Sequence, residues 1–140
     1  MDPIRFEVMG EPVGQGRPRT TVRNGRAIIY KPEKSKVYEA LVKAEAVKAM
    51  KGEKPTNAPV CLALFVRKSV PSGANKKTRA AMLAGELWPT KKPDLDNVVK
   101  AVCDALTGVV WEDDRQIVSL TADQKFSDKP HIVVTVFERQ

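Results

Sequence analysis

The sequence predicts an α+β fold in a single domain, residues 1–140, with a mixed or antiparallel sheet and flanking helices. Three observations support this prediction. A chain of 140 residues is long enough to bury about two thirds of its unfolded surface around one core. Hydrophobic residues make up 42% of the chain and charged residues 29%, which is ordinary for a globular protein. Strand-like and helix-like segments follow one another in the order β, β, α, β, α, α, β, β, without an internal repeat.

The first segments predict a strand, a hairpin and a long helix. Residues 4–10 alternate apolar and polar side chains, which is the period of a half-buried strand. After a loop rich in glycine and proline, Asn24 and Gly25 favour a tight hairpin turn that leads into a short strand at 27–30. Residues 33–51 predict an amphipathic helix with lysines on its outer face. Two neighbouring lines of apolar residues run along this helix: Val37, Leu41, Ala44 and Val47, beside Tyr38, Val42 and Ala46.

The later segments complete the predicted sheet. Residues 58–68 are dense in valine, leucine and phenylalanine and short enough to form a buried strand. A short basic helix is expected at about 76–83. Residues 115–126 and 131–139 are alternating, β-branched runs separated by a short polar turn, and we expect them to form an antiparallel pair.

Composition excludes several classes of protein. No apolar run approaches the roughly 20 residues that a membrane helix needs, and the N-terminus lacks the pattern of a signal peptide. We therefore expect a cytoplasmic protein that is not inserted in a membrane. Cys61 and Cys103 lie in apolar surroundings, which favours reduced core thiols. With His131 as the sole histidine, they do not make a four-ligand zinc site.

The charge is unevenly distributed along the chain. Residues 1–92 carry 19 lysines and arginines against 8 acidic residues, a net charge of +11, whereas residues 93–140 carry 5 against 9, a net charge of −4. A basic surface attracts polyanions, and nucleic acid is the first candidate because each neutralised phosphate releases counterions. The alternative is a basic surface that serves only solubility. Six carboxylates gather in one stretch, residues 91–117.

The acidic stretch predicts a helix from about Asn97, because Asp96 and Asn97 are favoured N-cap residues. Asp96, Lys100 and Asp104 are spaced four apart, which places them along one side of this helix. Asp94 lies two residues before Asp96, and in an extended lead-in this spacing points both carboxylates the same way. The expected apolar face consists of Val99, Val102, Cys103 and Leu106.

A second acidic group, Glu112, Asp113 and Asp114, follows the helix in the turn before a strand. If that strand lies beside the start of the helix, one of these acids faces Asp94 and Asp96. Mg²⁺ prefers hard oxygen ligands and keeps several waters, so two or three carboxylates from separate elements are sufficient to hold it. A helix cap and an acidic surface turn also explain the two groups separately. Both explanations stay open at this point.

The acidic stretch resembles the signature of the RusA-like Holliday junction resolvases. The shared pattern covers residues 92–118: an Asp-Leu-Asp-Asn group, a lysine one turn later and an Asp-Asp-x-Gln group. The resemblance implies the RusA-like version of the α+β fold. It also implies that Asp94, Asp96 and Asp114 bind the metal and that Lys100 is catalytic, with Mg²⁺ as the cofactor and Mn²⁺ as the alternative ion.

The same resemblance implies a homodimer that cleaves four-way DNA junctions by paired, symmetric nicks in DNA recombination, repair or phage DNA processing. Two alternatives stay open: a noncatalytic basic DNA-binding protein, and a nuclease for other branched or single-stranded DNA. Trp88 and Trp111 are candidates for stacking on unpaired bases, although a tryptophan in the setting of Trp111 is more typical of a core. The residues expected to contact DNA phosphates are Arg17, Arg19, Arg23, Arg26, Lys76, Lys77 and Arg79.

Overall fold

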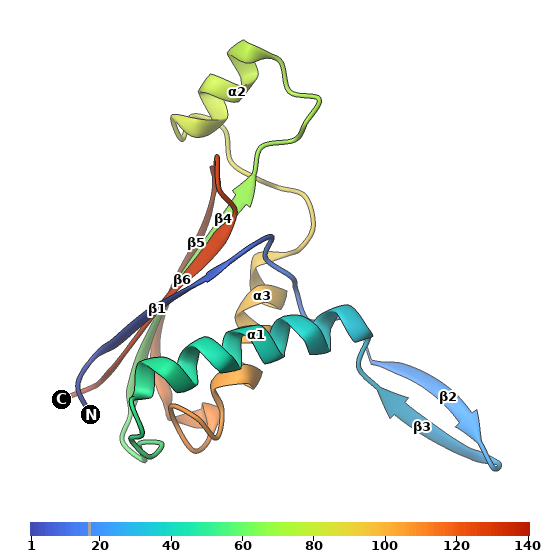
Figure 1. The fold of residues 1–140 in the computed structure, drawn as a ribbon, viewed down its shortest axis with the longest axis vertical. Helices are drawn as coiled ribbons and strands as arrows, with labels where there is room; N and C mark the ends of the chain where they lie inside the picture. Colours follow the sequence, from blue (N-terminus) through green and yellow to red (C-terminus); the bar gives the residue numbers. More distant parts are fainter. Residues whose placement is uncertain (17) are drawn as a thin grey trace.

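The computed structural model describes residues 1–16 and 18–140, so the predicted DNA contact Arg17 lies outside the described residues. A four-stranded sheet of order β1-β6-β4-β5 forms one layer, and helices α1 and α3 lie on one side of it (Figure 1). This arrangement confirms the predicted α+β class with a mixed sheet. In chain order the elements are β1 (Ile4–Met9), β2 (Arg19–Arg23), β3 (Arg26–Tyr30), α1 (Glu33–Met50), β4 (Val60–Ser69), α2 (Lys76–Leu83), α3 (Leu95–Leu106), the 3-10 helix η1 (Asp114–Gln116), β5 (Ile117–Ser127) and β6 (His131–Glu138).

Strand β4 lies inside the sheet, antiparallel to β6 and parallel to β5, and β1 pairs with the other edge of β6. The prediction that β5 and β6 pair with each other is therefore wrong, because β4 lies between them. Residues 128–130 connect these two strands across two strand spacings, about 10 Å, which a short extended link can bridge. The apolar run of β4 suits this interior position, because it can be buried with a partner on each edge.

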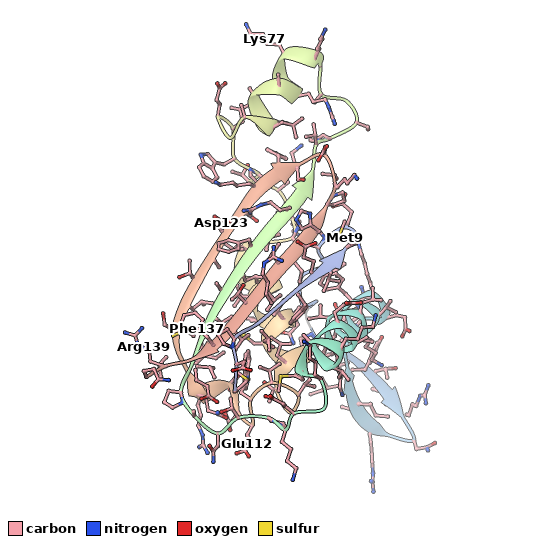
Figure 2. All side chains as sticks on the ribbon, turned by 60° about the vertical axis from the view of Figure 1, so that its left-hand side comes forward. Met9, Lys77, Glu112, Asp123, Phe137 and Arg139 are labelled. Atoms are coloured by element: carbon pink, nitrogen blue, oxygen red, sulfur yellow. The ribbon has the colours of Figure 1, made fainter. Side chains whose placement is uncertain are left out.

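The hydrophobic core lies between one face of the sheet and the two helices. Leu62, Leu64 and Val66 of β4 point into it, together with alternate residues of β1 and β6. Within the described residues, no helix covers the opposite face of the sheet, which carries Asp123 and Phe137 (Figure 2). None of the helices in the described part of the chain is long and apolar enough to cross a bilayer.

Helix α1 packs against α3 and β1 with only one of its two predicted apolar lines. The buried line is Ser35, Tyr38, Val42, Ala46 and Met50. The neighbouring line, which includes Val37, Leu41 and Val47, stays about half exposed. Helical spacing alone does not show which of the two lines faces the core, because both recur with the period of the helix.

Helix α3 begins at Leu95 with Asp94 as its N-cap, earlier than the expected start near Asn97. Its buried face is Val98, Ala101, Val102, Ala105 and Leu106, whereas the predicted face residues Val99 and Cys103 are only partly buried. The predicted face is therefore confirmed for Val102 and Leu106 and wrong for Val99 and Cys103, because the prediction passed over the small alanines on the buried side. Both cysteines are free thiols, as predicted, with Cys61 buried and Cys103 at the edge of the core.

Two basic elements extend from opposite ends of this body (Figure 1). The hairpin β2–β3 turns at Asn24 and Gly25, whose φ angles are 51° and 74°, so the predicted tight turn is confirmed. Helix α2 has the predicted bounds, and the Asn75 side chain caps it by accepting a hydrogen bond from the Thr78 amide at 2.8 Å. Helix α3 lies between the two elements.

Candidate active site

The start of α3 positions two of the predicted aspartates. Asp94 has extended backbone (φ −67°, ψ 143°), and its carbonyl accepts hydrogen bonds from the amides of Asn97 and Val98, both at 3.1 Å. Its carboxylate makes no cap bond and is exposed, as is the carboxylate of Asp96 in the first helical turn. Negative charge is favourable here because unpaired amides and the helix dipole leave the N-terminus of a helix partly positive.

Lys100 and Asp114 complete the set that the sequence predicted. Lys100 is exposed one helical turn after Asp96, and Asp114 opens the 3-10 helix η1 before β5. Burial raises the pKa of the Cys103 thiol to about 11, and the nearby charges of Asp114 and Asp104 add to this effect. The charge of Asp114 therefore lies close to α3, on the side that carries Cys103.

Within residues 1–16 and 18–140, the carboxylates of Asp94 and Asp96 and the ammonium of Lys100 make no hydrogen bond or ion pair, and the Asp114 carboxylate contacts that of its neighbour Asp113. Charged groups that do not stabilise the fold remain available for a ligand. The fold thus forms no ion pair with the four side chains predicted from the motif, and the exposed carboxylate of Glu112 is likewise unpaired among the described residues.

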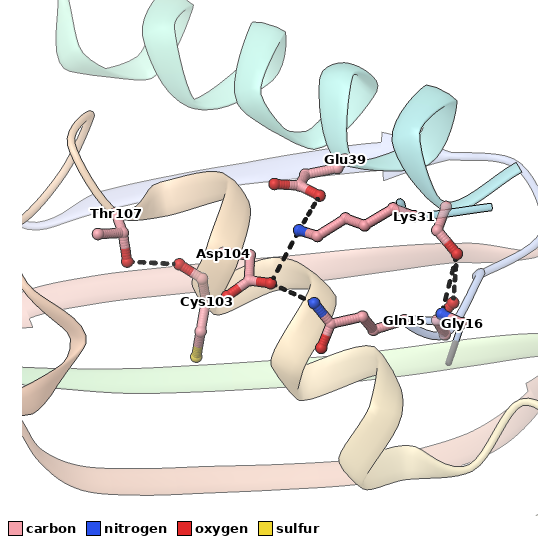
Figure 3. Close-up of polar contacts among 9 residues, drawn as sticks. Gln15, Gly16, Lys31, Glu39, Cys103, Asp104 and Thr107 are labelled. Atoms are coloured by element: carbon pink, nitrogen blue, oxygen red, sulfur yellow. Dashed lines mark hydrogen bonds and ion pairs between the residues drawn. The ribbon is translucent and has the colours of Figure 1, made fainter. Parts of the chain in front are cut away.

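Asp104 has a structural role. Its carboxylate accepts hydrogen bonds from the Gln15 amide and from Lys31, whose ammonium lies 3.2 Å from it and 3.0 Å from Glu39 (Figure 3). The Glu39 and Asp104 carboxylates raise the pKa of Lys31 above its ordinary value. Asp104 therefore ties α3 to the segments on either side of the basic hairpin.

Asp113 has a structural role too, which distinguishes it from the neighbouring Asp114. It caps η1, with its carboxylate accepting from the Arg115 amide at 3.0 Å. The Gln116 side chain accepts from the amide of Asp113 at 2.8 Å and donates to the carbonyls of Thr56 and Ala58, both at 2.9 Å. The Asp-Asp-x-Gln group thus builds a fixed turn from its first aspartate and its glutamine, and leaves the second aspartate exposed.

The N-terminal glycine loop packs against the start of α3. The Gln15 amide donates to the Asn97 carbonyl at 3.0 Å, and the Gly16 amide donates to the Ser35 hydroxyl at 2.9 Å. A Cβ at Gly14 would lie 3.0 Å from the side chain of Asn97 and 3.1 Å from that of Pro93, so the close approach favours glycine. Here the glycines serve packing between helices α1 and α3.

A cavity of about 620 Å³ opens between this loop, the start of α1 and the start of α3. Asp94 lines it together with the basic residues Arg19, Lys34 and Lys92. Asp96, Lys100 and Asp114 do not line this cavity. One carboxylate among several cations suits a phosphate that approaches with a bound cation.

Lys68 is a site residue that the sequence reading missed. It lies on β4 with only 7% of its surface exposed, and its ammonium donates to the carbonyls of Lys91 and Pro93, both at 2.6 Å. Burial lowers the pKa of Lys68, while the nearby charges of Asp94 and Glu11 oppose that shift. The buried ammonium fixes the backbone segment that directly precedes Asp94. A lysine in an apolar strand pattern was the only signal in the sequence.

The donor chemistry of the predicted ligands fits a hard divalent cation. Asp94 and Asp96 offer exposed carboxylate oxygens at the N-cap and in the first turn of α3, and Mg²⁺ is usually held by one or two carboxylates plus substrate phosphates. Within the described ranges, no three carboxylate, histidine or cysteine side chains are grouped closely enough to hold a metal ion. Asp114 lies on a separate turn and is not part of such a group.

The predicted DNA contacts fall into two sets. Arg19 lines the cavity beside Asp94, and Arg23 and Arg26 flank the hairpin turn. Lys76, Lys77 and Arg79 are on α2, where Lys77 projects from the far end of the molecule (Figure 2). The two basic sets therefore lie on opposite sides of α3.

The two tryptophans have different environments. Trp111 is fully buried and donates to the Thr107 hydroxyl at 3.1 Å, so it belongs to the core. Trp88 is 57% exposed, between α2 and α3 in the sequence, and remains available for stacking.

Exposed, unpartnered aspartates and a lysine between two basic elements are typical of enzymes that cleave nucleic-acid phosphodiesters. The comparison with known families is more specific. The chain belongs to the RusA family of endodeoxyribonucleases: the family model "Endodeoxyribonuclease RusA" matches residues 9–137. The chain is also 39% identical over 140 residues to an uncharacterized protein, YqaN, of Bacillus subtilis (strain 168), with 99% of this chain and 98% of the relative covered. The resemblance in the acidic stretch is thus confirmed.

Proposed function

We propose that this chain is a Mg²⁺-dependent endodeoxyribonuclease that acts as a homodimer and resolves four-way DNA junctions by paired, symmetric nicks. Mn²⁺ is the alternative ion, and DNA recombination, repair or phage DNA processing is the expected setting. One observation carries the proposal beyond family membership. The charged side chains of the family motif make no ion pair in the described part of the chain and, apart from a contact between Asp114 and Asp113, no hydrogen bond, whereas Asp104 and Asp113 of the same stretch serve the fold.

In this proposal Asp94, Asp96 and Asp114 hold the metal ion. When bound, the ion would act as a Lewis acid that stabilises negative charge on the scissile phosphate. Lys100 lies one turn from Asp96 on the exposed side of α3, where its ammonium stabilises the charge that develops during cleavage. The fixed turn at η1 and the packed start of α3 hold the backbone of these groups in place.

The basic elements bind the DNA arms on both sides of this centre. Arg19, Lys34 and Lys92 surround Asp94 and draw the scissile phosphate toward it. The hairpin residues Arg23 and Arg26 and the cations of α2 contact phosphates farther away. Such contacts position the duplex arms without reading their sequence.

The homodimer follows from the number of cuts. Each chain offers a single acidic centre, whereas resolution of a four-way junction needs two nicks in strands of like polarity. A two-fold dimer matches the two-fold symmetry of the junction and supplies both centres. Sedimentation of the protein with and without a junction tests this part directly, and a chain that remains monomeric on the junction would contradict it.

Cleavage of a labelled four-way junction tests the catalytic part of the proposal. With Mg²⁺, the wild-type protein should produce paired nicks, and omission of the ion should abolish them. Asp94→Asn and Asp114→Asn should lose cleavage and retain junction binding, while Asp128→Asn, the same change at an exposed turn residue, should cleave normally. Full cleavage by either purified site variant would overturn the assignment.

The same assay separates the two alternative functions. Junction binding without nicks in any metal would identify a noncatalytic DNA-binding protein. Equal cutting of flaps, linear single strands and junctions would identify a nuclease of broader specificity.

A further inference from the structure

A second cavity, of about 350 Å³, lies between the end of the sheet, helix α2 and the loop that leads to α3. Its apolar walls include Met82, Trp88, Pro89 and Phe126. The volume lies within the range of small-molecule binding sites, which are mostly apolar with a few polar groups. None of the metal-site residues discussed above lines this cavity, so it has no assigned role in the reaction.

The wall formed by residues 88–93 is fixed to the sheet at three points. The Gln124 side chain donates to the Pro89 carbonyl at 2.8 Å. Lys68 donates to the carbonyls of Lys91 and Pro93, both at 2.6 Å. A loop held by polar side chains from two strands is already ordered before a ligand arrives, which reduces the entropy lost on binding.

Trp88 is the group in this wall best suited to hold a flat ligand. More than half of its surface is exposed although it lines the cavity, and the Lys125 ammonium lies 5.7 Å from the centre of its ring. The lysine is attracted by the π face and helps to fix the orientation of the indole. Aromatic rings presented in this way bind unstacked nucleobases by stacking, whatever the base.

The cavity adjoins the candidate active site. Lys92 and Pro93 line both this cavity and the one that contains Asp94, and Pro93 directly precedes Asp94 in the chain. A nucleotide next to a phosphate held at Asp94 is therefore within reach of the Trp88 cavity. Lys91 and Lys92 supply positive charge along the path of the strand between the two cavities.

We infer that this cavity binds one unstacked nucleobase of the substrate strand, from a nucleotide adjoining the scissile phosphate, with Trp88 as the stacking platform. The inference rests on the proposed function, because it requires DNA at Asp94. It adds a base-binding site to the phosphate contacts, and this site holds the strand in register for cleavage. Ser69, Thr90 and Glu11 provide the polar groups around the base.

The test combines a protein substitution with a substrate substitution. A junction whose nick has been mapped is remade with a single abasic nucleotide at each position beside the nick, and the Kd of each junction is measured by fluorescence anisotropy in EDTA. For the wild type, one abasic position should weaken binding roughly 5- to 100-fold, the range of base–aromatic stacking. Trp88→Ala should weaken binding of the intact junction by a similar factor and lose the abasic effect, whereas Trp88→Phe should retain both. Leu87→Ala, at the exposed neighbour that does not line the cavity, is the matched control and should behave as wild type.

Tryptophan fluorescence gives an independent readout. Because Trp111 is fully buried, acrylamide quenching of the free protein reports on Trp88. The intact junction should protect Trp88 from acrylamide, and the junction with the critical abasic nucleotide should not. Additive effects of Trp88→Ala and the abasic change, or a Trp88 that remains open to acrylamide in the complex, would overturn the inference. If wild type nicks junctions normally while these tests fail, only the base site is refuted; if wild type neither binds nor nicks, the proposed function fails and the base site with it.

Discussion

Replacement of Lys68 by methionine separates the geometry of the site from the stability of the fold. Methionine fills a similar volume but removes the ammonium that donates to the carbonyls of Lys91 and Pro93 at 2.6 Å. The side chain is only 7% exposed, so little water can replace these bonds. The segment that precedes Asp94 then loses two of the hydrogen bonds that hold it to the sheet.

The expected loss of stability is moderate. A hydrogen bond from a charged donor contributes about 1.5–3 kcal/mol, and Lys68→Met removes two. The variant also no longer buries a charge, which offsets part of this loss, so we expect the free energy of unfolding to fall by about 1–3 kcal/mol. The effect on cleavage should be larger than the stability change alone explains. A displacement of about 1 Å at a catalytic group lowers rates by about 100-fold, and we expect a drop of roughly 10- to 100-fold.

Three measurements on the same preparations test this reasoning. Urea unfolding gives the stability, anisotropy in EDTA gives junction affinity, and single-turnover cleavage gives the rate at a temperature where every variant is folded. Lys129→Met, at an exposed lysine in the β5–β6 turn, is the matched control and should be unchanged in all three. Lys68→Arg keeps the charge and the donors, and it should recover part of the rate. A Lys68→Met protein that loses stability but cleaves at the wild-type rate would refute the positioning role, and one with unchanged stability would refute the anchoring itself.

The remaining predictions address the turn, the glycine loop and the end of strand β6. Asp113→Asn should cleave junctions normally, because asparagine also caps a helix, whereas Asp114→Asn should be inactive. Gel assays of junction cleavage by both variants test this difference, and an equal loss of cleavage in the two variants would contradict it. Gly14→Ala should lower the cleavage rate more than junction affinity, because its Cβ would lie 3.0 Å from the first turn of α3; an unchanged rate would show that this approach is not needed. A hydrogen bond from Thr56 holds the pKa of Glu138 below its ordinary value of 4.5. The ionised carboxylate therefore stabilises the fold at pH values above 4.5, and this stabilisation is lost as the pH falls through the lowered pKa. In urea unfolding, the free energy of unfolding of Glu138→Gln should be lower than that of the wild type at neutral pH, and the difference should decrease in acid. A difference in the free energy of unfolding that does not depend on pH would contradict this.

Local patterns predicted most elements of the fold. The bounds of α2 and the turn at Asn24 and Gly25 follow from capping and turn chemistry, which depend on a few adjacent residues. The pairing of β5 with β6 was predicted wrongly because strand order depends on contacts between distant segments. The apolar run of β4 is compatible with a central place between them, but a single sequence does not fix which two strands become its partners.

In the candidate site, too, features that depend on adjacent residues could be predicted from the sequence, and features that depend on distant residues could not. The spacing of Asp94, Asp96 and Lys100 is visible in the sequence because all three belong to one helix and its cap. The role of Lys68 was not visible, because the carbonyls that it binds lie more than twenty residues away in the chain. The structural role of Asp104 was hidden for the same reason, since its partners belong to the N-terminal loop and the segment before α1.

The concentration of acidic residues in a basic chain has a physical explanation in this division of roles. Asp104 forms an ion pair with Lys31, beside the basic hairpin, and Asp113 caps the turn at η1. Asp94 keeps its charge exposed in a cavity that Arg19, Lys34 and Lys92 also line, and its carboxylate makes no cap hydrogen bond. These cations attract a phosphate, so the fold can keep an anionic group ready for a divalent cation without repelling the DNA backbone. A basic body around a small acidic centre is therefore the charge distribution that metal-assisted cleavage of a polyanion requires.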